Sequence, residues 1–146
     1  MKILPAIGIG DLVFGMKTKD VEKVLGKPSK SFDDEDGNKV YLYNSYKARL
    51  TFYADEDFKF GYIICTHPKL EISGVKVFNE NTEKVKKELN AKGITVWEED
   101  DIDTMTRFFN EKNWFTLVSE YEEIICVELG ATIDKSDNFI WKFPKK

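Results

Sequence analysis

The sequence predicts an α+β fold of two tandem repeats, each a short helix packed on an antiparallel β-meander. Three observations predict it: residues 10–25 resemble residues 74–89, each of these segments has a helical pattern, and strand-like runs separated by short polar turns follow each one. With 146 residues, the chain has the length of one domain. The expected organisation is a single domain 1–146, with internal repeats at approximately 8–67 and 72–130 and a C-terminal tail at 131–146.

The repeat is the observation on which this organisation depends. Residues 10–25 and 74–89 share the pattern G-x-x-V-F-x-x-x-T-x-x-V-x-K-x-L, with seven identities in sixteen positions. Further along, Ile63-Ile64-Cys65 recurs as Ile124-Ile125-Cys126, in the same order and at nearly the same spacing. We expect a true duplication. The alternative is chance similarity between two amphipathic helices.

Each repeat is expected to begin with a short strand and a helix. In the first, Val13 and Phe14 form the strand, Thr18 is the N-cap, Val21 lies on the apolar face and Gly26 ends the helix. The second repeats this plan with Thr82, Val85, Leu89 and Gly93. Because helices of about two to three turns are unstable in isolation, each must pack on a sheet.

Strands are expected after each helix, because runs with alternating apolar residues are joined by short polar turns. The expected strands are Val40–Asn44, Arg49–Ala54 and Gly61–Thr66, then Thr104–Phe109, Trp114–Ser119 and Glu123–Leu129, with Ile94–Trp97 as a further short strand. The polar, acidic segment Ser29–Asn38 is expected to be a mobile loop. One sheet face should cover the helices, and the other should be partly exposed.

The composition limits the chemistry. One histidine and two cysteines make a histidine-based metal site or a disulfide scaffold improbable on composition alone. The acidic runs Asp33–Asp36 and Glu98–Asp101 lack the spacing of a calcium loop. We expect no cofactor, no metal and no catalytic residues. No signal peptide is recognised, so the expected location is cytoplasmic, with Cys65 and Cys126 reduced and in equivalent core positions.

The charge is concentrated in the second half. Residues 98–128 hold ten acidic residues against two basic ones, and this sign disfavours direct nucleic-acid binding. Several aromatics lie in or beside this window, and a single core face cannot absorb all of them. Aromatics rimmed by charge are typical of a protein-binding surface, whereas solvated strands around an ordinary core are the alternative. The candidate binding residues are Trp97, Glu98, Glu99, Asp100, Asp101, Asp103, Trp114 and Tyr121.

The segment from Gly10 to Val21 resembles a known family. Its residues fit the pattern G-x-x-x-F-G-M-x-x-x-x-V, which is similar to the start of units in the beta-lactamase inhibitor protein fold, shared by the BamE lipoproteins. The resemblance implies a cytoplasmic immunity-type protein that occludes the active site of a basic toxin domain, without contacting nucleic acid or membrane. The alternative is a non-catalytic structural or assembly scaffold, with an enzyme third. Transfer of function by fold is an analogy.

Overall fold

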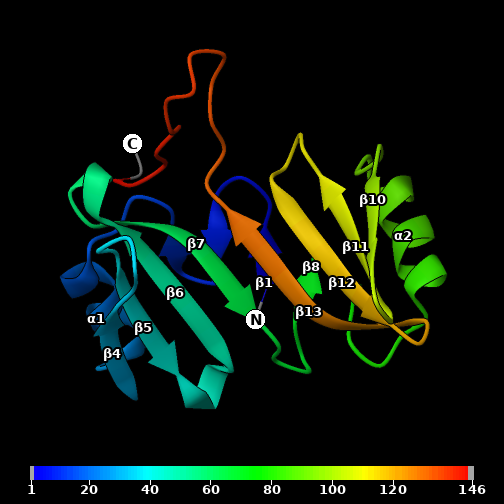
Figure 1. The fold of residues 1–146 in the computed structure, drawn as a ribbon, viewed down its shortest axis with the longest axis horizontal. Coiled ribbons are helices and arrows are strands. Elements are labelled where there is room, and N and C mark those ends of the chain that lie inside the picture. Colours follow the sequence, from blue (N-terminus) through cyan, green and yellow to red (C-terminus); the bar gives the residue numbers. More distant parts are fainter. Residues whose placement is uncertain (1, 145–146) are drawn as a thin grey trace.

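The computed structural model describes residues 2–144, which form one large sheet, one small sheet and two helices (Figure 1). The helices are α1 (Thr18–Leu25) and α2 (Thr82–Ala91). The large sheet contains β4 (Lys30–Asp33), β5 (Lys39–Tyr43), β6 (Ala48–Tyr53), β7 (Lys59–Cys65), β10 (Glu98–Ile102), β11 (Met105–Asn110), β12 (Phe115–Glu120) and β13 (Glu123–Gly130). All of its strand pairs are antiparallel, which confirms the α+β class.

The strand order is β10-β11-β12-β13-β7-β6-β5-β4, so the last strand of each half lies at the centre. There β13 pairs with β7, with Val127 opposite Cys65 and Leu129 opposite Ile63 (Figure 1). Each half therefore contains four consecutive strands that follow one helix. Val21 in α1 and Val85 in α2 are both fully buried.

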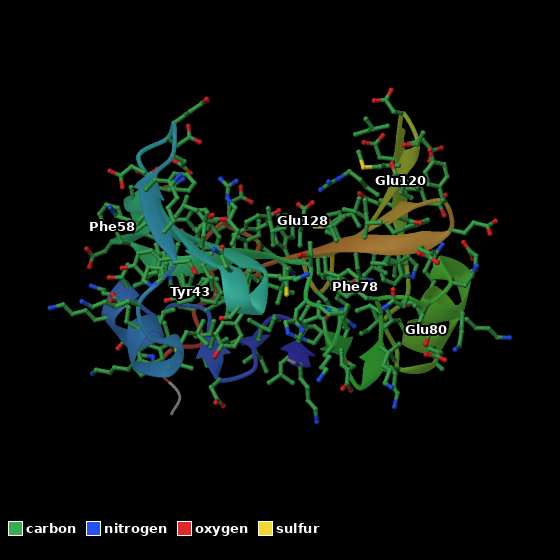
Figure 2. The ribbon with its side chains drawn as sticks, turned by 90° about the horizontal axis from the view of Figure 1, so that it is seen from below. Tyr43, Phe58, Phe78, Glu80, Glu120 and Glu128 are labelled. Carbon is green, nitrogen blue, oxygen red and sulfur yellow. The ribbon has the colours of Figure 1, made fainter. Side chains whose placement is uncertain are left out.

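The small sheet covers the same face as the helices (Figure 2). Its strands are β1 (Lys2–Leu4), β2 (Gly8–Ile9), β3 (Leu12–Val13), β8 (Glu71–Ile72) and β9 (Val75–Lys76), in the order β3-β2-β1-β8-β9. The core fills the space between this layer and the large sheet. Phe14 from the covering layer contacts Phe60 of β7, with ring centroids 4.9 Å apart, and Phe52 of β6 lies 6.0 Å from Phe60.

Two edge strands were missed by the sequence analysis. The segment expected as a mobile loop, Ser29–Asn38, contains β4 and the turn of a hairpin, in which the Asp34 carboxylate accepts backbone hydrogen bonds from Asp36 and Asn38. The other edge, β10, consists of exposed residues and begins one residue after the run 94–97, which is not a strand. Neither strand has a buried apolar face, so neither shows the alternation on which strand prediction depends.

The helix boundaries also differ in detail from the expectation. Lys17 and Asn81 precede the helices as N-cap residues, one position before the expected Thr18 and Thr82. Asn81 accepts hydrogen bonds from the backbone of residues 83 and 84, whereas Thr82 is buried and bonded to Ser119. Short 3-10 turns at Asn44–Tyr46 and Ala54–Glu56 connect strands of the first half.

The C-terminal segment docks onto the first half. Phe139 stacks on Tyr53, with centroids 5.4 Å apart, and on Trp141, at 4.9 Å. The backbone N–H groups of Lys142 and Phe143 donate to the carbonyl of Phe14. The described part of the tail is therefore anchored by both aromatic and backbone contacts.

Replacing Phe60 by alanine should lower the free energy of unfolding by about 3–5 kcal/mol, because it leaves a cavity among buried aromatics. Phe60 is 0% exposed, whereas Phe58, two residues earlier, is 42% exposed. Phe58→Ala is the matched control and should change stability by only about 0.5 kcal/mol. Urea unfolding of both variants provides the measurement, and equal losses would contradict this assignment of the core.

Candidate functional site

The face of the large sheet opposite the helices is concave and forms the candidate site. The two ends of the sheet rise on this side, and Glu128 lies in the hollow between them (Figure 2). Register places a row of side chains across this face, because residues directly opposite each other in neighbouring strands project to the same side. The row is Lys30, Leu42, Arg49, Ile64, Glu128, Thr116, Phe109 and Glu98.

At the centre of the row, Glu128 is held from both halves of the chain. Arg107 of β11 approaches it with two nitrogens, Nη2 to Oε1 at 3.0 Å and Nη1 to Oε2 at 2.9 Å. The Tyr62 hydroxyl of β7 donates to the same carboxylate. The Glu128 side chain is only 16% exposed. Paired guanidinium and carboxylate groups in this geometry form strong, directional hydrogen bonds, so the three side chains fix the floor of the concave face.

The surroundings of Glu128 determine its ionisation. Burial alone would raise the pKa of the Glu128 carboxyl, but hydrogen bonds from Arg107 and Tyr62 and the Arg107 charge together lower that pKa below its ordinary value of 4.5. Burial and the hydrogen bond to Glu128 raise the pKa of the Tyr62 hydroxyl. At neutral pH, the site therefore holds an ionised carboxylate neutralised by Arg107 and a protonated tyrosine.

A cavity of about 490 Å³ opens beside this centre toward β10. Its lining combines aromatic rings with carboxylates: Tyr62, Glu98, Glu99, Asp100, Arg107, Phe109, Trp114, Thr116 and Glu128. The rings of Phe109 and Trp114 meet edge to face, with centroids 5.2 Å apart. The Trp114 ring lies over Gly130, where a Cβ would be only 2.6 Å from the indole Cδ1. A glycine is thus required for the ring to occupy this wall.

Alternation along β10 divides the four acidic residues expected to act together. Glu98 and Asp100 stand opposite Phe109 and Arg107 and line the concave cavity. The Glu99 carboxylate instead lies 3.3 Å from Lys86 Nζ of α2. Asp101 accepts a hydrogen bond from Thr106 at 2.7 Å. The four acidic residues predicted as one set therefore form two pairs on opposite faces of β10, Glu98 with Asp100 and Glu99 with Asp101.

The remaining predicted residues are dispersed. Trp97 is structural, because its indole N–H donates to Asn90 of α2 at 3.1 Å and its ring packs on Phe115. Asp103 has a positive φ in the turn between β10 and β11. Tyr121 is 78% exposed in the turn between β12 and β13 and lines a smaller hollow of about 240 Å³ at the start of α2. Of the predicted residues, Trp114 joins Glu98 and Asp100 at the concave cavity, and Glu99 also lines it although its carboxylate is turned to Lys86.

Sequence reasoning missed Tyr62, Arg107 and Glu128, which form the floor, and Thr116, which lines the cavity beside them. Arg107 and Glu128 were counted only as charges in the acidic window, and Tyr62 was assigned to the other repeat. Correct strand pairing was the signal that could have joined them, because Ile64 and Glu128 are direct neighbours across the central pair. Opposite charges on the same face, on strands separated only by β12, would then have suggested a pair.

The two cysteines lie on opposite faces, which corrects the expectation of equivalent core positions. Cys65 is buried on the core side, and Cys126 is partly exposed beside Glu128 and Arg107. The pairing of β12 with β13 shifts register between Val118, which faces Cys126, and Ser119, which faces Ile124. This irregularity interrupts the alternation of β13, so Cys126 projects to the face opposite that of Cys65. Both cysteines are free thiols. Burial first, and then the neighbouring Glu128 charge, raise the pKa of the Cys126 thiol to about 11.

No family model and no curated protein sequence matches the chain. The solved structures that resemble it include an extracellular protein containing a SCP domain from Bacillus anthracis, with a TM-score of 0.55, and a cysteine-rich secretory protein from Staphylococcus aureus, with a TM-score of 0.52. Each is 13% identical over 80% of this chain, and the matches cover 43% and 44% of the solved chains. The likeness is one of fold, and this chain spans less than half the length of those proteins.

These structures overturn the expected location. The cytoplasmic prediction is wrong, because the similar proteins are described as extracellular in one case and secretory in the other. The prediction had rested on failing to recognise a signal peptide in the printed sequence. Among residues 2–144, no helix has both the length and the apolar character needed to cross a membrane.

Lowering the pH should destabilise the fold in part through Glu128. Because its pKa is lowered in the folded chain, the ionised carboxylate stabilises the fold above the unfolded-state pKa of 4.5, and this contribution disappears as the pH falls through the folded-state pKa. Unfolding measured from about pH 6 to about pH 3 should therefore show a smaller loss of stability in Glu128→Gln than in the wild type. An equally steep loss in both proteins would contradict the role assigned to Arg107 and Tyr62.

Both thiols should react slowly with a disulfide reagent in the native protein. Burial raises the pKa of both Cys65 and Cys126, and the thiolate is the reactive form. Single variants Cys65→Ala and Cys126→Ala assign the two rates, and denatured protein supplies the unprotected rate. Native labelling of Cys126 as fast as in the denatured chain would show that the concave face leaves this thiol activated.

Proposed function

We propose that the chain is a protein-binding module whose concave face binds a basic partner protein. The observation that carries the proposal is the asymmetry of the large sheet: its other face is covered by two helices and the small sheet, whereas among residues 2–144 no helix or second sheet covers the concave face (Figure 2). The C-terminal segment contacts one end of that face, where Phe139 stacks on Tyr53. The exposed hollow contains aromatic rings beside carboxylates. A desolvated aromatic centre with a charged rim is the usual composition of a binding hot spot.

Charge favours a basic partner. Within the described residues, Glu98 and Asp100 form no ion pair and no side-chain hydrogen bond, whereas Glu128 is neutralised by Arg107. The carboxylates available to a partner are thus at the β10 end of the face. Complementary charges at such a rim mainly accelerate association and set specificity.

Binding rather than catalysis is the role we infer. Cys126 near the site has a raised pKa, and the central carboxylate of Glu128 is fully engaged by Arg107 and Tyr62. The single histidine, His67, lies in a turn, where its Nδ1 accepts the backbone N–H of Lys69. These groups are suited to holding a shape rather than to transferring protons or attacking a substrate.

Two forms of this function remain proposals. In the form implied by the resemblance to beta-lactamase inhibitor protein-like and BamE-like proteins, the module is an immunity-type inhibitor that occludes the active site of a basic toxin domain. In the second, it is a non-catalytic structural or assembly scaffold module.

We further propose that the two halves are tandem repeats of one helix-plus-meander unit. The support is the buried valine of each helix and the mirrored strand order around the β7–β13 pair. On this proposal, the two ends of the concave face began as equivalent surfaces. Lys30 and Arg49 now stand near one end, and Glu98 and Asp100 stand at the other.

Charge reversal on one face of β10 should weaken partner binding selectively. Glu98→Lys with Asp100→Lys changes the concave face, whereas Glu99→Lys with Asp101→Lys makes the same net change on the opposite face. Partners selected from a displayed genomic-fragment library of the source organism should be basic. They should lose affinity about tenfold or more for the first variant and much less for the second, with surface plasmon resonance as the measurement.

A selected partner bound equally well by both double variants would contradict the concave face as the binding surface. The same complexes distinguish the two forms of the function. Loss of the partner's own activity on binding supports inhibition, and retained activity supports a scaffold. Circular dichroism of each variant confirms that the fold is intact, since exposed surface changes usually alter stability by about 0.5 kcal/mol or less.

A further inference from the structure

We propose that the concave cavity receives one arginine side chain from an extended segment of the partner, with Trp114 and Phe109 as its aromatic wall and Glu98 and Asp100 as its counter-charges. This inference rests on the proposed protein-binding function and adds the chemistry of recognition. Its site is the hollow of about 490 Å³ beside the Arg107–Glu128 pair.

The cavity has the two components that bind a guanidinium group. Phe109 and Trp114 meet edge to face at 5.2 Å, so their two rings present differently oriented surfaces to the same hollow. A cation over an aromatic face is attracted by the negative potential of the ring, most strongly over tryptophan. A planar guanidinium group can also stack on the ring while donating to a carboxylate.

The charges around the cavity select a cation rather than an anion or a neutral group. Arg107 would repel a second guanidinium, but both of its terminal nitrogens are turned to Glu128, which neutralises it. Glu98 and Asp100 then supply negative charge to the cavity from the neighbouring strand β10. A ligand carboxylate placed here would face these acids without a free cationic partner among the lining residues.

Two neighbouring depressions share lining residues with the hollow, which favours an extended segment over a small molecule. A second depression of about 580 Å³ shares Glu98 with the cavity, and a third of about 500 Å³ shares Trp114. These two share Glu111, Lys112 and Ile133 with each other. Together the three depressions are lined by residues of the large sheet, the β11–β12 turn and the C-terminal segment.

The walls of the neighbouring depressions indicate what flanks the arginine. Val96 is 81% exposed and lines the second depression together with Ile133. Val96 has a φ of 64°, and the buried Asn110 side chain donates to the carbonyls of Thr95 and Val96 and so holds this conformation. An exposed β-branched residue fixed in the left-handed region is costly and suggests a functional contact. Apolar residues next to the arginine would cover this position.

The test uses two fluorescein-labelled peptides that differ in one residue. One carries a single arginine between apolar residues, and its twin carries citrulline, which has a similar shape but no charge. We expect the arginine peptide to bind about tenfold more tightly in fluorescence anisotropy, because citrulline loses both the ring and the carboxylate attraction. This preference should vanish in Glu98→Gln with Asp100→Asn and persist in Glu99→Gln with Asp101→Asn.

The aromatic wall is tested separately. Trp114→Phe should retain most of the preference for arginine, and Trp114→Leu should lose it. Because Trp114 packs over Gly130 and its loss could disturb the fold, the wild-type protein supplies a second readout. The arginine peptide should shift the indole N–H resonance of Trp114 in nuclear magnetic resonance spectra. The resonance of Trp97, whose indole donates to Asn90, should not shift.

Equal binding of the two peptides, no binding of either, or an unshifted Trp114 resonance would each overturn the inference. Failure here is distinguishable from failure of the proposed function. If Glu98→Lys with Asp100→Lys still weakens the selected protein partner, the concave face is a binding surface that does not recognise arginine. If neither the peptides nor the partner respond to these changes, both proposals are wrong.

Discussion

The pairing of β7 with β13 is the interaction on which the rest of the structure depends. It joins the two four-stranded halves into one sheet and places Ile63 and Leu129 side by side in the common core. It also brings Tyr62 from the first half to Glu128 from the second, although the two residues are 66 positions apart. Arg107 and Glu128 both belong to the second half, so the pairing of the halves adds Tyr62 to their ion pair and completes the floor of the concave face.

Because the core is buried on one face of the large sheet, the concave face is left free of core packing. Both helices, the small sheet and the aromatic core lie on one face, which leaves the concave face to be stabilised by its own side chains. Arg107, Glu128 and Tyr62 satisfy one another there, and the described residues contain no buried side-chain nitrogen or oxygen without a partner. A preorganised polar floor of this kind binds with little loss of side-chain freedom, because its side chains are already ordered.

Much of the fold could be predicted from local pattern, and much of the site could not. Val21 and Val85 belong to clear helical patterns, and each inner strand has one apolar face, so burial dictated these elements. The edges β4 and β10 bury no apolar row, and only pairing with a neighbour makes them strands. The predicted acids were therefore treated as one loop-like cluster. Once β10 is known to be a strand, alternation alone separates Glu98 and Asp100 from Glu99 and Asp101.

The division of the β10 acids between two faces helps to explain why this edge strand is so acidic. Charged residues on an edge strand prevent unwanted pairing between sheets, and this purpose would be served by acids on either face. The acids on the helix side nevertheless have partners within the chain, Lys86 for Glu99 and Thr106 for Asp101. Glu98 and Asp100 lie instead beside the rings of Phe109 and Trp114, in a hollow whose one arginine is already neutralised. Protection of the edge accounts for the charge of β10 but not for an aromatic cavity on one side of it, and a cationic group from a partner accounts for both.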